Sequence, residues 1–349
     1  MLLVDQFKDR LHKYVEVTDL GELHWMLGIE IHRDHTGHTV YLSQGAYIDS
    51  ILCHYNFKDL KPLSTPMDTH VQLTTKQAPS STAEFAAMHN IPYHKVVGAL
   101  NWAALATHPN IAFAVSTITH FAANPSPAHW EAIKHIFQYL AGTRNLWLTY
   151  SEMKHTLVGY ANTDSSMAED CHAISGYTFL IDRGTMSWSS KRQEIISLST
   201  TESEYIAATH SMKEVLWLHS LLSQVFGKFK SAMVMFSDNQ AIIALTCNHQ
   251  YHVCTKHINV CYHWICWVVE QGTLWLVLLP LNLHFLPFLP HFPLLSPSVI
   301  SLLCVRLYDS AGSDDSDDSS PLPTDSDSVP FLDIQGSCLY LGRLLFSQV

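Results

Sequence analysis

The order of strand-like and helix-like segments in the second half of the chain restricts the fold more than any other sequence feature. Three short apolar runs come first, and a long helical segment from Thr200 to about Phe226 follows them. A fourth strand-like run, two further helical segments and a last strand-like run complete the pattern. This order predicts an α/β fold in which helices pack on one mixed sheet. The strand-like runs are Leu157–Asn162, Gly176–Ile181, Thr185–Trp188, Val234–Phe236 and Leu274–Leu279, and the later helices are Asn239–Thr246 and Lys256–Glu270.

The first half of the chain predicts a hairpin followed by a mainly helical region. Apolar runs at His24–Ile31 and His38–Leu42 flank Asp34–Gly37, whose residue types favour a tight turn. The stretch Thr69–Thr82 is rich in Thr, Ser, Gln and Pro, which is typical of an exposed linker. Helices are expected over residues 1–15, Ser43–Tyr55, Pro92–Thr107, Ile111–Ala123 and Ala128–Gly142.

The segment after Pro280 has a different composition. It is apolar at first, but prolines interrupt it at positions 287, 290, 293 and 297. A bilayer-spanning helix needs about 20 uninterrupted apolar residues, so no membrane association is expected. Ser310–Ser328 is rich in Ser, Asp and Pro and is predicted to be disordered.

The overall composition suggests an intracellular protein but gives no support for tight nucleic-acid binding. The formal net charge is −11, whereas contacts to phosphates require an excess of Lys and Arg. The eight cysteines form no CxxC pair, and the N-terminal segment lacks a secretory signal. We therefore expect a reducing compartment, cytoplasmic or nuclear.

Three acidic residues occupy positions at which strand ends and helix starts can converge on one edge of the sheet. Asp164 follows the first strand, Glu202 lies in the first turn of the long helix, and Asp238 follows the fourth strand. Carboxylate oxygens are preferred ligands of Mg²⁺. Two such ions about 4 Å apart can drive phosphodiester hydrolysis, so these residues are candidate catalytic and metal-binding groups.

Each of these carboxylates also has a purely structural interpretation. Ser199 and Glu202 have the spacing of a capping box, in which the glutamate satisfies backbone N–H groups at the helix start. Asp238 has the position of a helix N-cap, and Asp164 that of a turn residue. Taken singly, the residues favour these structural roles.

Longer motifs strengthen the catalytic interpretation. ISGYTFLIDRGTMSWSSKRQEIISLSTTESEY, FSDNQAIIAL and TKHINVCYH follow one another in the second half. Together they closely resemble the ribonuclease H domain of copia-type retrotransposon Pol polyproteins. Upstream segments resemble the end of the reverse transcriptase and the connecting region of the same polyproteins: DLGELHWMLGIEI, LSQGAYIDSIL, STPMD, YHKVVGALNWAA, HPNIAFAV and HWEAIKHIFQYLAGT. The resemblance extends from residue 1 to about residue 279.

The resemblance implies both a domain organisation and an activity. Residues 1–66 would be a truncated reverse-transcriptase C-terminal part, 67–153 a linker and helical connection, 154–280 a ribonuclease-H-like domain, and 281–349 a non-homologous, largely disordered tail. The implied reaction is Mg²⁺-dependent cleavage of RNA in RNA–DNA hybrids during reverse transcription. Glu202 and Asp238 would be metal ligands, and Asp164 a neighbouring third. The implied partners are hybrid or single-stranded nucleic acid and other parts of the polyprotein.

Departures from the family pattern indicate a degenerate site. The family's first strand ends in Asp-x-Asp, whereas this chain has Asn162 and Asp164, so a neutral amide replaces the first carboxylate. Asn259 stands where the family has Asp, and the segment that supplies a last carboxylate is replaced by the proline-broken stretch. Non-basic residues also stand where the family usually has Arg: Cys171, Cys254, Cys261, Cys266 and Trp275.

Other functions remain open from the sequence. The family's Tyr-x-Asp-Asp polymerase motif is absent, so polymerisation by this chain is not expected. A non-catalytic nucleic-acid-binding module and an inert pseudogene product are the alternatives to a weakened nuclease. A zinc site is a minor alternative, because several ligand types crowd one segment. These are His252, Cys254, His257, Cys261, His263 and Cys266.

Overall fold

A computed structural model describes most of the first 278 residues of the chain. The described residues are 2–68, 70–151, 157–164, 172–181, 184–197, 199–226, 233–240, 242, 259–272 and 274–278. The chain divides into two units, Met1–Asp309 and Ser310–Val349, and every described residue lies in the first. The expected tail 281–349 therefore lies outside the described residues. No helix in the described part is long and apolar enough to cross a bilayer.

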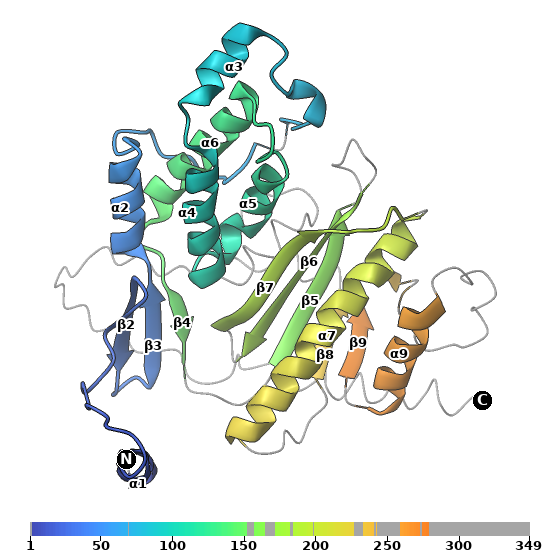
Figure 1. The fold of residues 1–349 in the computed structure, drawn as a ribbon. Coiled ribbons are helices and arrows are strands. Elements are labelled where there is room, and N and C mark those ends of the chain that lie inside the picture. The colour runs from blue at the N-terminus through green and yellow to red at the C-terminus, as the bar shows by residue number, and fades with distance from the viewer. Residues whose placement is uncertain are drawn as a thin grey trace, which may run out of the picture. The chain divides into compact units, whose positions relative to one another are not determined.

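A small antiparallel sheet contains the predicted hairpin (Figure 1). Its strands, in spatial order, are β1 (Trp25–Met26), β2 (Ile29–Asp34), β3 (Thr39–Ser43) and β4 (Leu148–Tyr150). Asp34 closes the β2–β3 turn, since its Oδ1 accepts hydrogen bonds from the N–H groups of Thr36 and Gly37 at 2.9 and 3.0 Å. The first predicted run is split in two, because Leu27 and Gly28 adopt φ values of 54° and 79° and turn the chain between β1 and β2.

The region from residue 45 to residue 143 is mainly helical, as predicted, although α3 was not expected, and a further predicted helix lies at the N-terminus. The helices are α1 (Leu2–His12), α2 (Gly45–His54), α3 (Thr82–His89), α4 (Tyr93–Ala106), α5 (Ala112–Thr119) and α6 (Pro127–Thr143), with short 3₁₀ turns at Thr75–Gln77 and Pro109–Ile111. Helix α2 starts after Gln44 rather than being capped by Ser43, and α6 is capped by Ser126, whose Oγ accepts from the N–H of His129. A common core buries the apolar faces of α2, α4, α5 and α6, with Leu100 and Phe137 fully inaccessible.

The second half forms the expected mixed sheet with flanking helices. Its strands are β5 (Leu157–Asp164), β6 (Ile174–Ile181), β7 (Gly184–Arg192), β8 (Met233–Ser237) and β9 (Leu274–Leu278), and its helices are α7 (Thr200–Phe226) and α9 (Asn259–Glu270). The spatial order is β7-β6-β5-β8-β9, in which β5–β6–β7 are antiparallel and β8 and β9 run parallel to β5. Of the predicted helix 239–246, most residues lie outside the described part.

Helix α7 packs across the sheet (Figure 1), and the apolar side chains between the helix and the strands form the main core of the second half. Buried residues at helical spacing on α7, including Tyr205, Ala208 and Met212, contact Phe179 and other apolar residues of the strands. The ring of Phe179 occupies the space beside Gly159 on the neighbouring strand, where any Cβ would collide with it. The absence of a side chain at Gly159 therefore lets α7 and the sheet pack closely.

Candidate functional site

The C-terminal ends of β5 and β8 bring the predicted site together at one edge of the sheet. These strands are adjacent and parallel, with Tyr160 level with Phe236 in the ladder. Asn162 follows Tyr160 by two residues, and Asp238 follows Phe236 by two residues. The register of the two strands therefore places Asn162 and Asp238 side by side along the sheet. The sequence analysis expected Asp164, Glu202 and Asp238 to converge; the strand register brings Asn162, rather than Asp164, level with Asp238.

Asn162 and Asp164 lie on the same face of β5, because side chains alternate along a strand. The strand continues to Asp164, which pairs with Ile174, so Asp164 is a strand residue rather than the turn residue expected from the sequence. Asn162 is 3% exposed, and its Oδ1 accepts the backbone N–H of Thr163 at 2.6 Å. The Asn162 amide oxygen, which stands at the family's first aspartate position, is therefore fixed by the hydrogen bond from the next residue.

Glu204, a residue that the sequence analysis did not select, lies near Asp238. Burial is the main reason that the pKa of Glu204 is raised to about 8; the charge of the nearby Asp238 carboxylate contributes to this shift, and hydrogen bonding to Thr163 opposes it. Partial burial of its carboxyl also raises the pKa of Asp238, although the residue as a whole is exposed to solvent. The Glu204 carboxyl is thus near enough to Asp238 for the charge of Asp238 to disfavour the ionised form of Glu204.

Glu202 occupies the first turn of α7, as expected, and is 8% exposed. Its backbone N–H donates to Ser199 Oγ at 3.2 Å, which is the Ser199 half of the predicted capping box. Glu202 and Glu204 are two residues apart on a helix, so their side chains leave it about 200° apart.

Helical periodicity is the signal that could have selected Glu204. The buried stripe of α7 that faces the sheet includes Ala208 and Met212. Stepping back four residues from Ala208 gives Glu204 and not Glu202. The sheet-facing stripe therefore ends on Glu204 at the end of the helix nearest the strand ends.

Comparison with known proteins reveals the family. A protein of Nicotiana tabacum named retrovirus-related Pol polyprotein from transposon TNT 1-94 is 40% identical over 275 residues, which are 78% of this chain and 20% of that protein. The corresponding polyprotein from transposon RE1 of Arabidopsis thaliana is 33% identical over 269 residues, 76% of this chain and 18% of that protein. The chain belongs to the copia-type retrotransposon Pol polyproteins. It spans about a fifth of the length of these curated relatives.

A much shorter relative also exists. Secreted RxLR effector protein 161 of Plasmopara viticola is 38% identical over 133 residues, which are 38% of this chain and 94% of that protein. A segment of Pol-like sequence thus makes up nearly all of a small protein. No protein-family model matches the chain.

The solved structures with detectable likeness are ribonucleases H and viral reverse transcriptases. LC11-RNase H1 in complex with an RNA/DNA hybrid aligns with a TM-score of 0.29 and 12% identity over 37% of this chain and 89% of that one. A foamy viral protease-reverse transcriptase aligns with a TM-score of 0.36 and 12% identity over 64% of this chain and 29% of that one. These scores are low, and the ribonuclease-H-like assignment for this Pol chain rests on its own mixed sheet and its family.

The side chains at this sheet edge offer oxygen donors, which suit a hard divalent cation, but they are few. Glu204 and Asp238 offer carboxylate oxygens, and Asn162 offers a neutral amide oxygen. Among the residues that the structure describes, no three His, Cys, Asp or Glu side chains lie close enough to hold a metal ion. Mg²⁺ is commonly held by one or two carboxylates with water and substrate phosphate, so these residues fit one weakly held ion.

The zinc alternative falls largely outside the described structure. His252, Cys254 and His257 are not among the described residues, whereas Cys261 and His263 belong to α9. Cys266 is buried in α9 at 2% exposure. The minor zinc interpretation stays a prediction.

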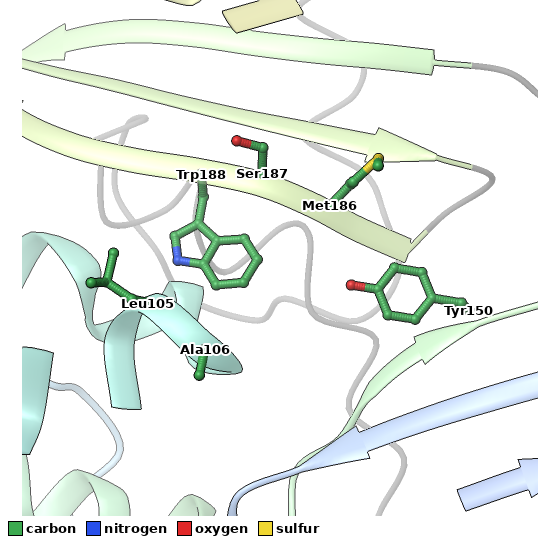
Figure 2. Close-up of a pocket in the computed structure, with 6 residues that line it drawn as sticks. All are labelled: Leu105, Ala106, Tyr150, Met186, Ser187 and Trp188. Carbon is green, nitrogen blue, oxygen red and sulfur yellow. The ribbon is translucent and has the colours of Figure 1, made fainter. Parts of the chain in front are cut away.

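A shallow, open cavity in the described structure is lined by none of the residues of the acidic edge. Figure 2 shows it between the end of α4 and strand β7, with the Trp188 ring on one side and Tyr150 of β4 nearby. The cavity holds about 230 Å³, and its lining is Leu105, Ala106, Tyr150, Met186, Ser187 and Trp188. It contains no carboxylate, so the candidate site is the open edge at Asp238 rather than this cavity.

Proposed function

We propose that the ribonuclease-H-like domain, predicted to span residues 154–280, binds RNA–DNA hybrids and cleaves the RNA strand weakly with the help of Mg²⁺. The observation that carries this proposal is the proximity of Glu204 to Asp238 at the end of the sheet where β5 carries Asn162, two residues before the strand ends at Asp164. Oxygen ligands at an open edge can be reached by a nucleic-acid backbone. The activity is weakened because Asn162 supplies no negative charge.

The residues of the chain have distinct roles in this proposal. Glu204 replaces Glu202 as the metal-binding glutamate, since Glu204 is the one that lies near Asp238. A bound Mg²⁺ would supply an activated water and stabilise the leaving oxygen. Asp164 lies roughly 6–7 Å along β5 from Asn162, so it would need a shift of the strand end to contribute.

Hybrid cleavage by the full chain tests the proposal. A labelled RNA–DNA hybrid is incubated with the parent chain and with Asn162→Asp, in Mg²⁺ and in Mn²⁺. We expect slow metal-dependent cleavage by the parent and a gain of about 100-fold from the restored carboxylate, in the range typical of one electrostatic catalytic group. Equal rates for the parent and Asn162→Asp would contradict the proposed reason for weak activity.

A matched pair of glutamate variants decides which glutamate carries the reaction. In the Asn162→Asp background, Glu204→Gln is expected to abolish cleavage and Glu202→Gln to leave most of it. The reverse result would return the role to Glu202. Cleavage that survives both Glu204→Gln and Asp238→Asn would refute the proposed site altogether.

A non-catalytic hybrid-binding module is the second candidate. It is favoured by one observation: Asn162 keeps the shape of an aspartate and its Oδ1 is satisfied by Thr163, so the edge can stay formed without cleavage. This candidate predicts salt-dependent hybrid binding by the parent chain without turnover in either metal. If the parent chain does not bind the hybrid even at low salt, the binding module is refuted and the remaining alternative is an inert pseudogene product.

A further inference from the structure

Gln193 has a fixed position between β7 and α7. It directly follows β7, and its backbone N–H donates to the carbonyl of Ala173 at 2.8 Å. Its own carbonyl lies 2.9 Å from Nδ1 of His172. Because the main chain is held on both sides, the buried side chain, 2% exposed, has little freedom to leave its place.

The side-chain amide of Gln193 joins the start of α7 to the sheet. Its Nε2 donates to the carbonyl of Ser203 at 2.7 Å and to Oγ of Ser175 on β6 at 2.8 Å. Both amide hydrogens are thereby used. Its Oε1, in contrast, is buried and has no hydrogen-bond partner among the described residues.

The unpaired oxygen shows that this residue is not explained by stability alone. A buried acceptor without a donor is unfavourable, whereas an apolar side chain of similar shape would avoid the loss. Gln193 therefore occupies a place where a methionine would pack without an unpaired oxygen. The feature that an apolar residue cannot supply is the pair of N–H groups directed at Ser203 and Ser175.

The Ser203 carbonyl is also held from the site side. Thr163 Oγ1 donates to it at 3.2 Å, and Thr163 is the β5 partner of Ser175 in the β5–β6 ladder. The next residue along α7 is Glu204, whose carboxylate lies close to Thr163. Strands β5 and β6 and the end of β7 thus hold the helix turn that carries the glutamate.

We propose that Gln193 is a positioning residue, which fixes the Ser203 carbonyl and thereby the place of the adjacent Glu204 carboxylate at the metal site. Glu204 and Asp238 carry like charges when ionised and would separate if the first turn of α7 could move. The donor pair of Gln193 opposes that movement. This inference rests on the proposed function, because it assigns Gln193 to the same metal site.

Binding of Mn²⁺ alone to the full chain tests the inference without relying on turnover. The electron paramagnetic resonance signal of unbound Mn²⁺ is titrated against the parent, Gln193→Met and Glu204→Gln. Loss of a group that orients a metal ligand typically weakens metal affinity by about 10- to 100-fold, so we expect a shift of this size for Gln193→Met. Glu204→Gln should abolish binding at the same site.

Asn110→Leu is the matched control for a general loss of stability. Asn110 is also a buried amide at 2% exposure, with Nδ2 donating to the Tyr139 hydroxyl at 2.6 Å and Oδ1 without a partner among the described residues. Asn110 lies in the 3₁₀ turn Pro109–Ile111, beside the helical core of the first half of the chain and not beside the core that α7 forms with the sheet. The unfolding midpoint of Asn110→Leu shows how the loss of such a buried amide alters stability, and we expect this variant to bind Mn²⁺ like the parent.

The outcomes separate the two proposals. If Glu204→Gln loses Mn²⁺ while Gln193→Met binds as tightly as the parent, the positioning role is wrong and the site stands. If neither the parent nor Asn162→Asp binds Mn²⁺, the proposed function fails and the positioning role fails with it. Should Gln193→Met not fold, Thr163→Val removes the other side-chain donor to the same carbonyl, and unchanged affinity there would overturn the inference.

Discussion

Acidification should destabilise the chain through His108, a histidine far from the acidic edge in sequence. His108 is 2% exposed, and its Nδ1 lies 2.8 Å from Thr107 Oγ1. Its Nε2 is buried without a partner among the described residues. Burial lowers the pKa of His108 to about 4, because no nearby acceptor compensates the charge of the protonated ring.

The size of the effect follows from proton linkage. The unfolded chain has an ordinary histidine pKa of about 6.5, so between pH 6.5 and 4 the unfolded state binds more protons than the folded state. The stabilisation is complete above pH 6.5 and is lost as the pH falls towards 4. Each pKa unit corresponds to about 1.4 kcal/mol, so the loss is about 2 kcal/mol at pH 5 and approaches about 3 kcal/mol below pH 4.

Urea unfolding of the parent at pH 7 and pH 5, followed by circular dichroism, measures this loss. His108→Asn keeps a polar atom near the position of Nδ1 but cannot titrate, so its free energy of unfolding should fall by about 2 kcal/mol less than that of the parent between the two pH values. His94→Asn, at an exposed position on α4, should retain the parent's pH dependence. The argument is refuted if the parent and His108→Asn lose the same free energy on acidification.

Three further changes test the packing and the electrostatics of the domain by urea unfolding. Gly159→Ala should lower the free energy of unfolding by about 1–3 kcal/mol, because the new Cβ collides with the buried Phe179 ring. The control Gly98→Ala, in open space on α4, should be neutral or stabilising by up to about 1 kcal/mol, and equal changes in the two variants would contradict the collision with Phe179. The pKa of Glu204 is about 8 in the folded chain against an ordinary 4.5, so the metal-free parent loses stability as the pH rises from 4.5 to 8. Glu204→Gln should therefore have a higher free energy of unfolding than the parent at pH 8.5, but not at pH 4.5. Trp188→Phe should cost about 1 kcal/mol by removing the 2.8 Å hydrogen bond from Nε1 to α4, and an unchanged midpoint would show that this bond contributes nothing.

Most of the fold could be predicted because strands and helices of the second half follow their local patterns. Strands β5 to β9 and helix α7 all form where the apolar periodicity indicated. Strand β4 was missed because Leu148–Tyr150 is too short to show an alternation, and it exists only through pairing with β3 about a hundred residues earlier. Helix α3 was missed although its start carries a capping box, in which Ser81 Oγ accepts from the N–H of Glu84.

The site could be predicted as to its edge and its chemistry, but not as to every residue. The sequence analysis expected Asp164, Glu202 and Asp238 where strand ends and a helix start can converge; the parallel pairing of β5 and β8 puts Asn162, two residues before Asp164, level with Asp238. The choice between Glu202 and Glu204 depends on the rotation of α7 about its axis. That rotation is set by the buried contacts of α7 with the sheet and not by the capping signal at the helix start.

Asn162 shows how function and stability can change in opposite directions at this edge. The Asp238 carboxylate disfavours the ionised form of Glu204, so a third carboxylate at residue 162 would add to the repulsion. The amide of Asn162 removes that charge and still accepts the N–H of Thr163 at 2.6 Å. The neutral residue therefore keeps the strand end in shape and relieves the metal-free site, while it weakens the attraction for a divalent ion. The hydrogen bonds that hold the turn at Ser203 do not depend on the charge of residue 162, so the geometry of the proposed site does not require a carboxylate at this position.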